Sequence, residues 1–396
     1  MSTFVKYVDE VKIPGGDLGS PGSWNTVDVS PYMQDTSAIG VTLRAFHAID
    51  NTTFGVRTPG ALFPPSAKVF INYYVDYAVS FGGSGNTVEI LYSGTTVGWK
   101  VFVTGEIHGD HAALHDAVTE IPLSEPWSTW KDVQVTPIGV DVVGDIAAVI
   151  VQHYTSDVGS RFGLREKGDS RSDNGQRRES SHHWYVVGVD ANGYYQIFTS
   201  GKVNAQQFSR FYETGYILKT GSIVTLEALT GMGLAEQDGS YAAIDFSSEV
   251  SSEAFIVGGR WHNPLGDNLT RNAFLRATGS AEDTNGIVIH KGDHSIGSWV
   301  GLDVDLTAEY QTETAATPVD FFVEWYELVP SELFLWDADT RRVMGASALP
   351  TPALDAGSGA RSPLEAAPGA PETPIDAEAE TETPFDAEAE TGPQEP

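Results

Sequence analysis

The chain has 396 residues, with 54 acidic and 23 basic side chains and no cysteine, so its formal net charge is −31 at pH 7. The absence of cysteine excludes disulfides, thiolate metal sites and cysteine nucleophiles, and each domain must be stabilised by core burial alone. The charge disfavours a nucleic-acid partner, because phosphate binding needs a basic face.

The distribution of the acidic residues predicts adaptation to high salt. Residues 351–396 hold 11 acids and one base, which leaves −21 on the rest of the chain. Self-repulsion of this kind destabilises a compact state, and concentrated salt relieves it because the screening length falls to about 3 Å at 1 M. The alternative is an ordinary acidic protein with an acidic tail. No apolar run is long enough for a membrane span or a signal-peptide core, so we expect a soluble chain that is not inserted in a membrane.

The elements predicted along the chain are almost all strands. Residues 1–22 contain "PGGDLGSPG" and are predicted as an extended N-terminal anchor segment. Short runs rich in Val, Ile, Tyr, Phe and Trp follow, separated by Gly, Asn, Asp and Ser, which is typical of an all-β fold. Hairpins are predicted at residues 186–198, with "DANG" as the turn, and at residues 332–346. From residue 347 the composition predicts a disordered acidic tail, in which "ETPIDAEAE" is followed by "ETPFDAEAE".

Three similar strings divide the chain. "FGVRTPG" places an arginine at position 57, "FGLREKG" at 165 and "AFLRATG" at 276, so the intervals are 108 and 111 residues. An aromatic residue precedes each arginine by 33 to 35 positions. A repeat of this length predicts whole domains. The predicted divisions are 1–22 (anchor), 23–118 (module 1), 119–232 (module 2), 233–346 (module 3 with a terminal hairpin) and 347–396 (tail).

Each module is predicted to be a β-sandwich of the jelly-roll type. The second one holds seven or eight predicted strands in about 100 residues, a number that suits two packed sheets. An immunoglobulin-like topology is the alternative, because strand order cannot be read from one sequence.

The repeated residues are interpreted as framework. Arginine at a strand end offers a rigid fork of donors, and a glycine three positions later suits a turn with positive φ. Ligand contact by the three arginines is the alternative, which the freely varying neighbours disfavour. The repeated framework residues are Trp24, Arg57, Gly60, Trp130, Arg165, Gly168, Tyr241, Arg276 and Gly279.

The second module carries a resemblance to a known group of proteins. "WKDVQVTP", "FGLREKGD", "HHWYVVGVDANGYYQIFTS" and "RFYETGYI" follow one another between residues 130 and 217. This order resembles a β-sandwich repeat of structural proteins of tailed viruses, including environmental and archaeal ones. Module one matches in part, and module three keeps only "YAAIDFSS" and "AFLRATG". The resemblance implies a virion structural protein and carries over no catalytic residue.

Two stretches are candidates for binding. "EIHGDHAALHD" places His108, His111 and His115 in one short segment, and imidazoles three and four residues apart converge on a metal if the segment is helical. An exposed polar linker is the alternative, and no metal is predicted. The polar loop after Gly168 and the strand that follows it are the second candidate, as a binding loop at a sandwich end. Its residues are Arg171, Arg177, Arg178, His182 and His183.

No catalytic residue or cofactor site is predicted. The chain has no P-loop, no dinucleotide-binding glycine motif, no H-E-x-x-H and no G-x-S-x-G. Asp303 and Asp305 are predicted to alternate along a strand and share a face, but acids are too abundant for the pair to indicate glycoside hydrolysis.

The expected function is therefore that of a virion structural protein, as a turret, decoration, spike or fibre of a tailed virus, with a halophilic archaeon as the host. Its expected partners are further copies of itself, most simply in a trimer, other virion proteins that contact residues 1–22, and a host-surface glycan or protein. A carbohydrate-binding adhesin is the alternative. A glycan-cleaving enzyme is a third hypothesis.

Overall fold

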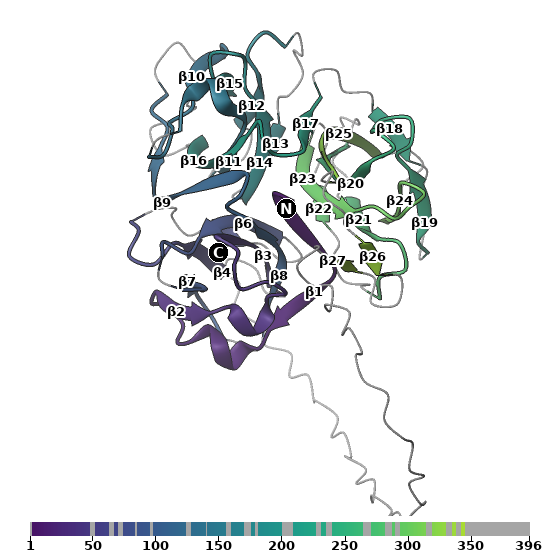
Figure 1. The fold of residues 1–396 in the computed structure, drawn as a ribbon. Coiled ribbons are helices and arrows are strands. Elements are labelled where there is room, and N and C mark those ends of the chain that lie inside the picture. Colours follow the sequence, from purple (N-terminus) through teal and green to yellow (C-terminus); the bar gives the residue numbers. More distant parts are fainter. Residues whose placement is uncertain are drawn as a thin grey trace, which may run out of the picture. The chain divides into compact units, whose positions relative to one another are not determined.

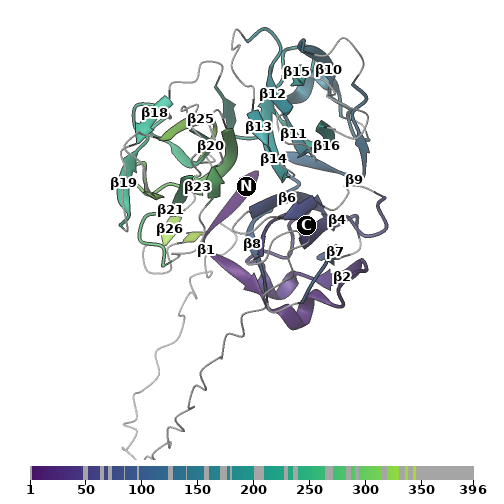
Figure 2. The same cartoon turned by 180° about the vertical axis from the view of Figure 1, so that it is seen from behind.

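The computed structural model shows an all-β protein of antiparallel sheets (Figures 1 and 2). Short 3-10 turns occur at Gly15–Leu18, Ser30–Tyr32 and Val143–Asp145. Where the structure describes the chain, no helix is long and apolar enough to cross a membrane. The described residues are 2–47, 52–62, 67–69, 74–83, 85–95, 98–123, 128–139, 141–155, 160–169, 176–178, 181–199, 209–226, 231–234, 240–263, 271–281, 287–289, 294–313, 319–329, 335–337 and 342–344.

The first strands of the chain form two sheets, which we call the first sheet pair. One sheet has the order β1–β8–β3–β6 and the other has the order β2–β7–β4–β5. The bounds are β1 (Phe4–Ile13), β2 (Asn25–Asp28), β3 (Gly40–His47), β4 (Thr52–Arg57), β5 (Ala67–Val69), β6 (Tyr74–Ser80), β7 (Thr87–Tyr92) and β8 (Trp99–Ile107).

The second sheet pair repeats this order. Its sheets are β9–β16–β11–β14 and β10–β15–β12–β13, so each strand has the same neighbours as the strand eight places earlier. The bounds are β9 (Ala112–Glu120), β10 (Lys131–Gln134), β11 (Ile146–Thr155), β12 (Ser160–Glu166), β13 (Gln176–Arg178), β14 (Ser181–Gly188), β15 (Tyr194–Thr199) and β16 (Ser209–Leu218).

The third sheet pair repeats it again, with one addition. Its sheets are β17–β25–β20–β23 and β19–β24–β21–β22, and β18 pairs with β25 beside β17. The bounds are β17 (Ile223–Thr225), β18 (Gly231–Leu234), β19 (Ala242–Asp245), β20 (Ala254–Asn263), β21 (Arg271–Ala277), β22 (Ile287–Ile289), β23 (His294–Gly301), β24 (Thr307–Glu313) and β25 (Val319–Leu328).

Each sheet pair has its own hydrophobic core. Strands such as β7 alternate buried and partly exposed residues, because successive side chains of a strand point to opposite faces. In the first pair, Leu43 and Val103 of one sheet and Phe54 and Ile90 of the other belong to one buried cluster. Equivalent clusters fill the second and third pairs. The inward-facing residues of these strands therefore build the cores.

A β-bulge recurs at the same place in the three pairs. Thr104 is the unpaired residue where β8 meets β3, Thr214 where β16 meets β11, and Glu324 where β25 meets β20. The three residues are spaced by 110 positions. A bulge leaves one residue unpaired and bends its strand. Its recurrence shows that the three pairs share the residue-by-residue register of these strands as well as the strand order.

A further buried cluster joins the three sheet pairs, and we call it the shared core. Phe4 of β1 lies 5.7 Å from the ring of Trp184, 5.8 Å from that of Trp299 and 5.5 Å from that of Trp325. These rings come from all three pairs and are buried. The other buried members are Ala78, Ile107, Ala112, Leu114, Ala148, Ile150, Val186, Ile217 and Ile256.

Trp299 of the third pair packs closely against the backbone of β8 in the first pair. Counted from the bulge, Trp325 occupies the position of Gly105 and Gly215 in the other two pairs. A Cβ on Gly105 would lie 2.7 Å from the ring of Trp299. The close approach of Trp299 and of the Val5 carbonyl oxygen therefore leaves no room for a side chain at Gly105 in the first pair.

Three expectations from the sequence differ from the structure. The region predicted as an anchor contains β1, which pairs with β8 as an integral strand and supplies Phe4 to the shared core. Each sheet pair also begins earlier than the predicted boundaries 23, 119 and 233, at β1, β9 and β17. β1 and β9 were missed because their apolar residues are mixed with charged residues and histidine, and β17 was missed because it has only three residues.

The hairpin predicted at residues 186–198 is wrong as a strand pair. Its turn is present, since Asp190 Oδ1 accepts hydrogen bonds from the backbone N–H groups of Asn192 and Tyr194. However, β14 pairs with β11 in one sheet, whereas β15 pairs with β10 and β12 in the other. The "DANG" turn is thus a crossover between sheets. The second predicted hairpin is present as β26 (Leu335–Asp337) and β27 (Arg342–Met344). The predicted tail lies outside the described residues.

Candidate functional site

The repeated framework residues form three similar clusters, which we call clamps. In the first, the Arg57 guanidinium lies 4.1 Å from the ring centroid of Trp24. In the second, Arg165 lies 3.9 Å from the ring of Trp130. The third clamp stacks arginine on tyrosine at 3.4 Å, with Arg276 over Tyr241. Guanidinium groups stack on aromatic rings by cation–π attraction and planar contact.

A side chain on the neighbouring strand holds each arginine. Arg57 Nε donates to Glu89 Oε2 at 2.6 Å, and Arg276 Nε donates to Glu309 Oε2 at 2.7 Å. Arg165 Nε donates to Gln196 Oε1 at 2.7 Å. In each case the two residues are paired directly across the ladder. The clamps thus tie the first, second and third strands of one sheet together on its outer face.

The glycines that follow the arginines occupy the left-handed region. Gly60 has φ of 78°, Gly168 of 97° and Gly279 of 71°. A side chain is unfavourable at such φ values, so glycine fits the turn that ends each strand. The structure thus brings together, in each copy, the aromatic residue and the arginine that the sequence singled out, and it places the glycine in the adjacent turn.

Replacing a clamp arginine should lower stability moderately. We expect Arg276→Ala to reduce the free energy of unfolding by about 1–2 kcal/mol, because both the stacking and the charge-assisted hydrogen bond are lost while the site is partly exposed to water. Arg276→Lys should recover less than half of this loss, since an ammonium lacks the planar fork. Urea denaturation measures both, and a fully stable Arg276→Ala variant would contradict a framework role.

The three histidines of "EIHGDHAALHD" do not converge. The segment forms a turn and then β9, so His108, His111 and His115 have different partners. His111 Nδ1 lies 3.2 Å from Thr220 Oγ1, and His115 Nε2 lies 3.4 Å from Glu213 Oε1. No group of three metal-ligating side chains occurs among the residues that the structure describes. The extended backbone separates side chains that a helical turn would bring together.

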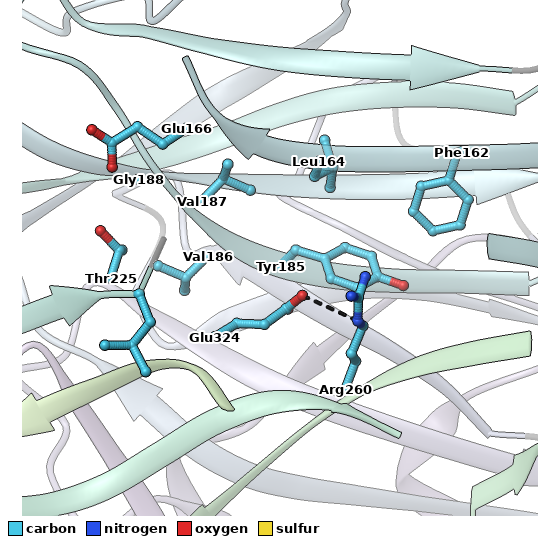
Figure 3. Close-up of a pocket in the computed structure, with 11 residues that line it drawn as sticks. Phe162, Leu164, Glu166, Tyr185, Val186, Val187, Gly188, Thr225, Arg260 and Glu324 are labelled. Atoms are coloured by element: carbon cyan, nitrogen blue, oxygen red, sulfur yellow. Dashed lines mark ion pairs between the residues drawn. The ribbon is translucent and has the colours of Figure 1, made fainter. Parts of the chain in front are cut away.

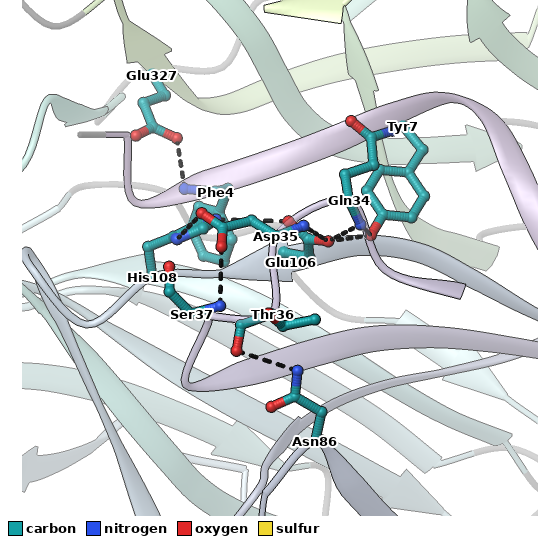
Figure 4. A network of polar contacts seen from close by, with 10 residues as sticks. All are labelled: Phe4, Tyr7, Gln34, Asp35, Thr36, Ser37, Asn86, Glu106, His108 and Glu327. Carbon is teal, nitrogen blue, oxygen red and sulfur yellow. Dashed lines mark hydrogen bonds and ion pairs between the residues drawn. The ribbon is translucent and has the colours of Figure 1, made fainter. Parts of the chain in front are cut away.

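His108 belongs to a buried polar network around Glu106 (Figure 4). Glu106 is fully buried and accepts hydrogen bonds from the hydroxyl of Tyr7 and from the backbone N–H groups of Gln34 and Asp35. His108 Nε2 lies 3.6 Å from the second carboxylate oxygen of Glu106. Buried carboxylates require such donors. Here they fix the loop after Ser30–Tyr32 against β8, which is a structural role.

The residues of the predicted binding loop are in two different environments. His182 and His183 are buried at the start of β14. His182 Nε2 lies 2.8 Å from Gln152 Oε1, and burial lowers the pKa of His182 to about 3. Arg177 and Arg178 lie in β13, and their side chains are outside the described part, as is the whole of Arg171.

His183 takes part in the contact between the first and second sheet pairs. Its Nδ1 lies 3.3 Å from Asp76 Oδ2, and Arg44 Nε donates to Asp76 Oδ1 at 2.8 Å. Burial favours a raised pKa for Asp76, but Arg44 and His183 outweigh it and lower the pKa to about 2. The buried carboxylate is therefore ionised and paired. The sequence shows no sign of this contact, because its partners are about 30 and 110 residues apart.

A pocket lies where residues of the second and third sheet pairs meet (Figure 3). Phe162, Leu164, Tyr185 and Val187 line its apolar part. Glu166, Thr225, Arg260 and Glu324 line its polar part, and Arg260 Nε lies 3.6 Å from Glu324 Oε1. Its volume is about 450 Å³, of which a part is open solvent. Glu324 is also the unpaired bulge residue of β25. The pocket's ion pair is therefore formed by a residue at the position of the repeated bulge.

Asp303 and Asp305 do not share a strand face. They lie in the turn before β24, where Asp303 Oδ1 accepts hydrogen bonds from the backbone N–H groups of Asp305 and Thr307. This is the arrangement that Asp190 makes in the second sheet pair. The pair is therefore a repeated turn rather than a carboxylate couple for hydrolysis.

Comparison with protein-family models finds no match for the chain, and comparison with curated proteins finds no similar one.

Proposed function

We propose that the chain is a structural protein of a virus particle, and that its three sheet pairs are tandem jelly-roll modules. The observation that carries the proposal is the strand order, which occurs three times with the same bulge and with one shared core. Jelly rolls consist of two four-stranded sheets built from Greek keys and are frequent in viral capsid proteins. The order 1–8–3–6 with 2–7–4–5 fits such a connectivity and supports the proposal.

The side chains of the clamps support a structural role over catalysis. Each clamp arginine is held by residues of its own sheet, and the buried carboxylates Glu106 and Asp76 serve loops and contacts between sheet pairs. The large apolar side chains that are well exposed in the described part are Leu62, Val142, Val304 and Val329, and no aromatic ring is among them. The aromatic rings of the described residues are thus partly or fully buried.

Assembly with other proteins is part of the proposal. The faces of the sheets that meet in the shared core are used within the chain, so contacts between copies must use other surfaces. We propose a homo-oligomer, most simply a trimer, which contacts other virion proteins through residues 14–23, most of which are exposed although Leu18 is buried. Light scattering in concentrated salt should return a multiple of the chain mass, and the mass of a single chain would contradict the oligomer.

The decisive experiment on function is localisation. Mass spectrometry of density-purified particles from cells that produce the chain should find it at a constant ratio to other particle proteins through the gradient. A chain that remains with the unassembled proteins, or that sediments independently of particles, would refute a virion function.

Salt should stabilise the protein. Residues 1–350 have a formal net charge of −21, so their acidic groups repel one another, and dissolved ions screen that repulsion. We expect the melting temperature to rise steadily from low salt to molar sodium or potassium chloride, as measured by differential scanning fluorimetry. Sucrose at equal osmolality serves as the uncharged control. A flat or falling dependence on salt would refute adaptation to high salt and the halophilic host with it.

A further inference from the structure

The second clamp differs from the other two in charge. Its arginine is held by the neutral Gln196, where the other copies have Glu89 and Glu309. Gln196 Nε2 donates to Asp132 Oδ1 at 2.8 Å, and Lys167 Nζ lies 2.7 Å from Asp132 Oδ2. The hydrogen bond and ion pair with Lys167 hold the pKa of Asp132 below its usual range, so this carboxylate is ionised. Arg165, Lys167 and Asp132 together therefore carry +1, whereas the arginine and glutamate of each of the other two clamps are neutral together. The Asp190 carboxylate also acts on Lys167 from the turn before Tyr194, and the third pair has Asp303 in the same turn.

The second clamp also differs in its aromatic residues. Tyr194, Gln196 and Phe198 alternate with buried residues along β15 and share the outer face of the sheet. The ring of Phe198 lies 5.5 Å from that of Trp130, and Lys167 Nζ lies 4.4 Å from the ring of Tyr194. By ladder register, the positions of Tyr194 and Phe198 are Thr87 and Leu91 in the first pair, and Thr307 and Gln311 in the third. This outer face carries three rings, whereas that of the first pair has Trp24 and that of the third pair has Tyr241 and Phe274.

The arrangement is pre-organised and reachable. The chain of contacts runs from Phe198 through Trp130, Arg165, Gln196 and Asp132 to Lys167 and Tyr194. The three residues Trp130, Tyr194 and Phe198 are partly exposed. The Asp132 and Lys167 side chains are 43% and 36% exposed. From Tyr194 to Phe198 the row spans about 13 Å of extended strand.

We propose that this outer face of β10, β15 and β12 binds an acidic glycan, that is, a chain of sugars bearing carboxylate or sulfate groups. Aromatic side chains offer an apolar body to the C–H faces of sugar rings, and Gln196 and Asp132 supply amide and carboxylate groups for hydroxyls. The cationic centre matches an anionic substituent, in a chain whose overall charge repels anions. Binding here would give the proposed virion protein its contact with a host surface, and in that respect the inference rests on the proposed function.

The test uses the other two clamps as internal references. Binding of oligogalacturonate and of sulfated dextran to the full-length protein is measured by isothermal titration at moderate ionic strength, with neutral dextran as the uncharged probe. We expect binding of at least one acidic probe and none of neutral dextran. Gln196→Glu installs the residue that the first and third clamps use, and it should weaken binding about tenfold by adding a negative charge at the clamp. Because glutamate would face Asp132, where the other two pairs have Thr26 and Ala243, a melting curve of the variant serves as the control for folding. Phe198→Ala should weaken binding at least fivefold.

Glu309→Gln is the matched control, because it makes a cationic clamp in the third pair, which has Thr307 and Gln311 in place of Tyr194 and Phe198. It should gain no affinity for the acidic probes. The proposal would be overturned if Gln196→Glu left binding unchanged, if neutral dextran bound equally well, or if Glu309→Gln acquired binding. It would also be overturned if light scattering showed self-association of the protein that Gln196→Glu abolishes, because the face would then bind a second copy of the chain. Failure of glycan binding leaves the particle-localisation experiment unaffected, so the two proposals fail separately.

Discussion

Phe4→Ala is expected to be among the most destabilising single substitutions in the chain. The ring is fully buried between Trp184, Trp299 and Trp325, so its removal leaves a cavity where the three sheet pairs meet. Loss of a buried phenylalanine ring costs about 3–5 kcal/mol. Urea denaturation followed by tryptophan fluorescence measures this change.

A double-mutant cycle distinguishes the shared core from an ordinary core position. Phe4→Ala and Trp184→Ala should couple by about 1 kcal/mol or more, because the two rings touch although they belong to different sheet pairs. Phe211→Ala is the matched control, since that ring is equally buried but belongs to the core of the second pair alone. Its effect should add to that of Phe4→Ala. Additivity in both combinations would contradict the shared core.

The second large effect is a pH dependence that arises from Glu327. This side chain of β25 is fully buried, and its carboxylate accepts hydrogen bonds from the backbone N–H groups of Thr3 and Phe4, the latter at 3.0 Å (Figure 4). In the first and second pairs the same position is Ile107 or Ile217. Burial raises the pKa of Glu327 from 4.5 to about 8, although the hydrogen bonds oppose the rise.

Between these two pKa values the folded chain keeps a proton that the unfolded chain has lost. The stability due to Glu327 is thus complete below about pH 4.5 and decreases as the pH rises through 8. His182 has the opposite dependence, because its pKa falls from 6.5 to about 3, but that dependence ends near pH 6.5. We therefore expect the free energy of unfolding to fall by about 2 kcal/mol between pH 6.5 and 8.

Glu327→Gln should remove this fall. The amide resembles the protonated carboxyl group and does not titrate, so the variant's stability should be nearly constant over the same interval. Denaturation curves at the two pH values, with wild type and variant side by side, measure the difference. An equal slope for both proteins would show that Glu327 is not the group responsible.

The sequence predicts the fold class and the repeated framework residues because both depend on local or periodic patterns. The stacking of each arginine on its ring was seen only in the structure. Alternating apolar residues specify strands, and the repeated arginine, aromatic residue and glycine keep their spacing in each copy. The crossover at Asp190 was misread as a hairpin, since a turn signal does not tell which sheet the next strand joins. The contact between Phe4 and Glu327 could not be predicted, because these residues are more than 300 positions apart in the sequence.

Contacts between residues far apart in the sequence also explain which site residues were misjudged. His182 and His183 follow a polar loop, so they resemble loop residues, yet Gln152 and Asp76 cover them from other strands. The three histidines near residue 110 suggested a metal only if that segment were helical. The special character of the second clamp was visible in the sequence as Gln196 in place of glutamate, but the ladder register was needed to show that these positions are equivalent.

Hydrogen exchange in the native state tests most directly whether the three sheet pairs form one cooperative unit around the shared core. The central strands β3, β11 and β20 are the reporters, one from each pair, and exchange of their backbone amides is followed by mass spectrometry at increasing denaturant. Shared burial of Phe4, Trp184, Trp299 and Trp325 predicts that the three strands open together, with the same free energy and the same dependence on denaturant. Opening free energies that differ by more than about 2 kcal/mol among the three strands would show separate units and contradict the shared core.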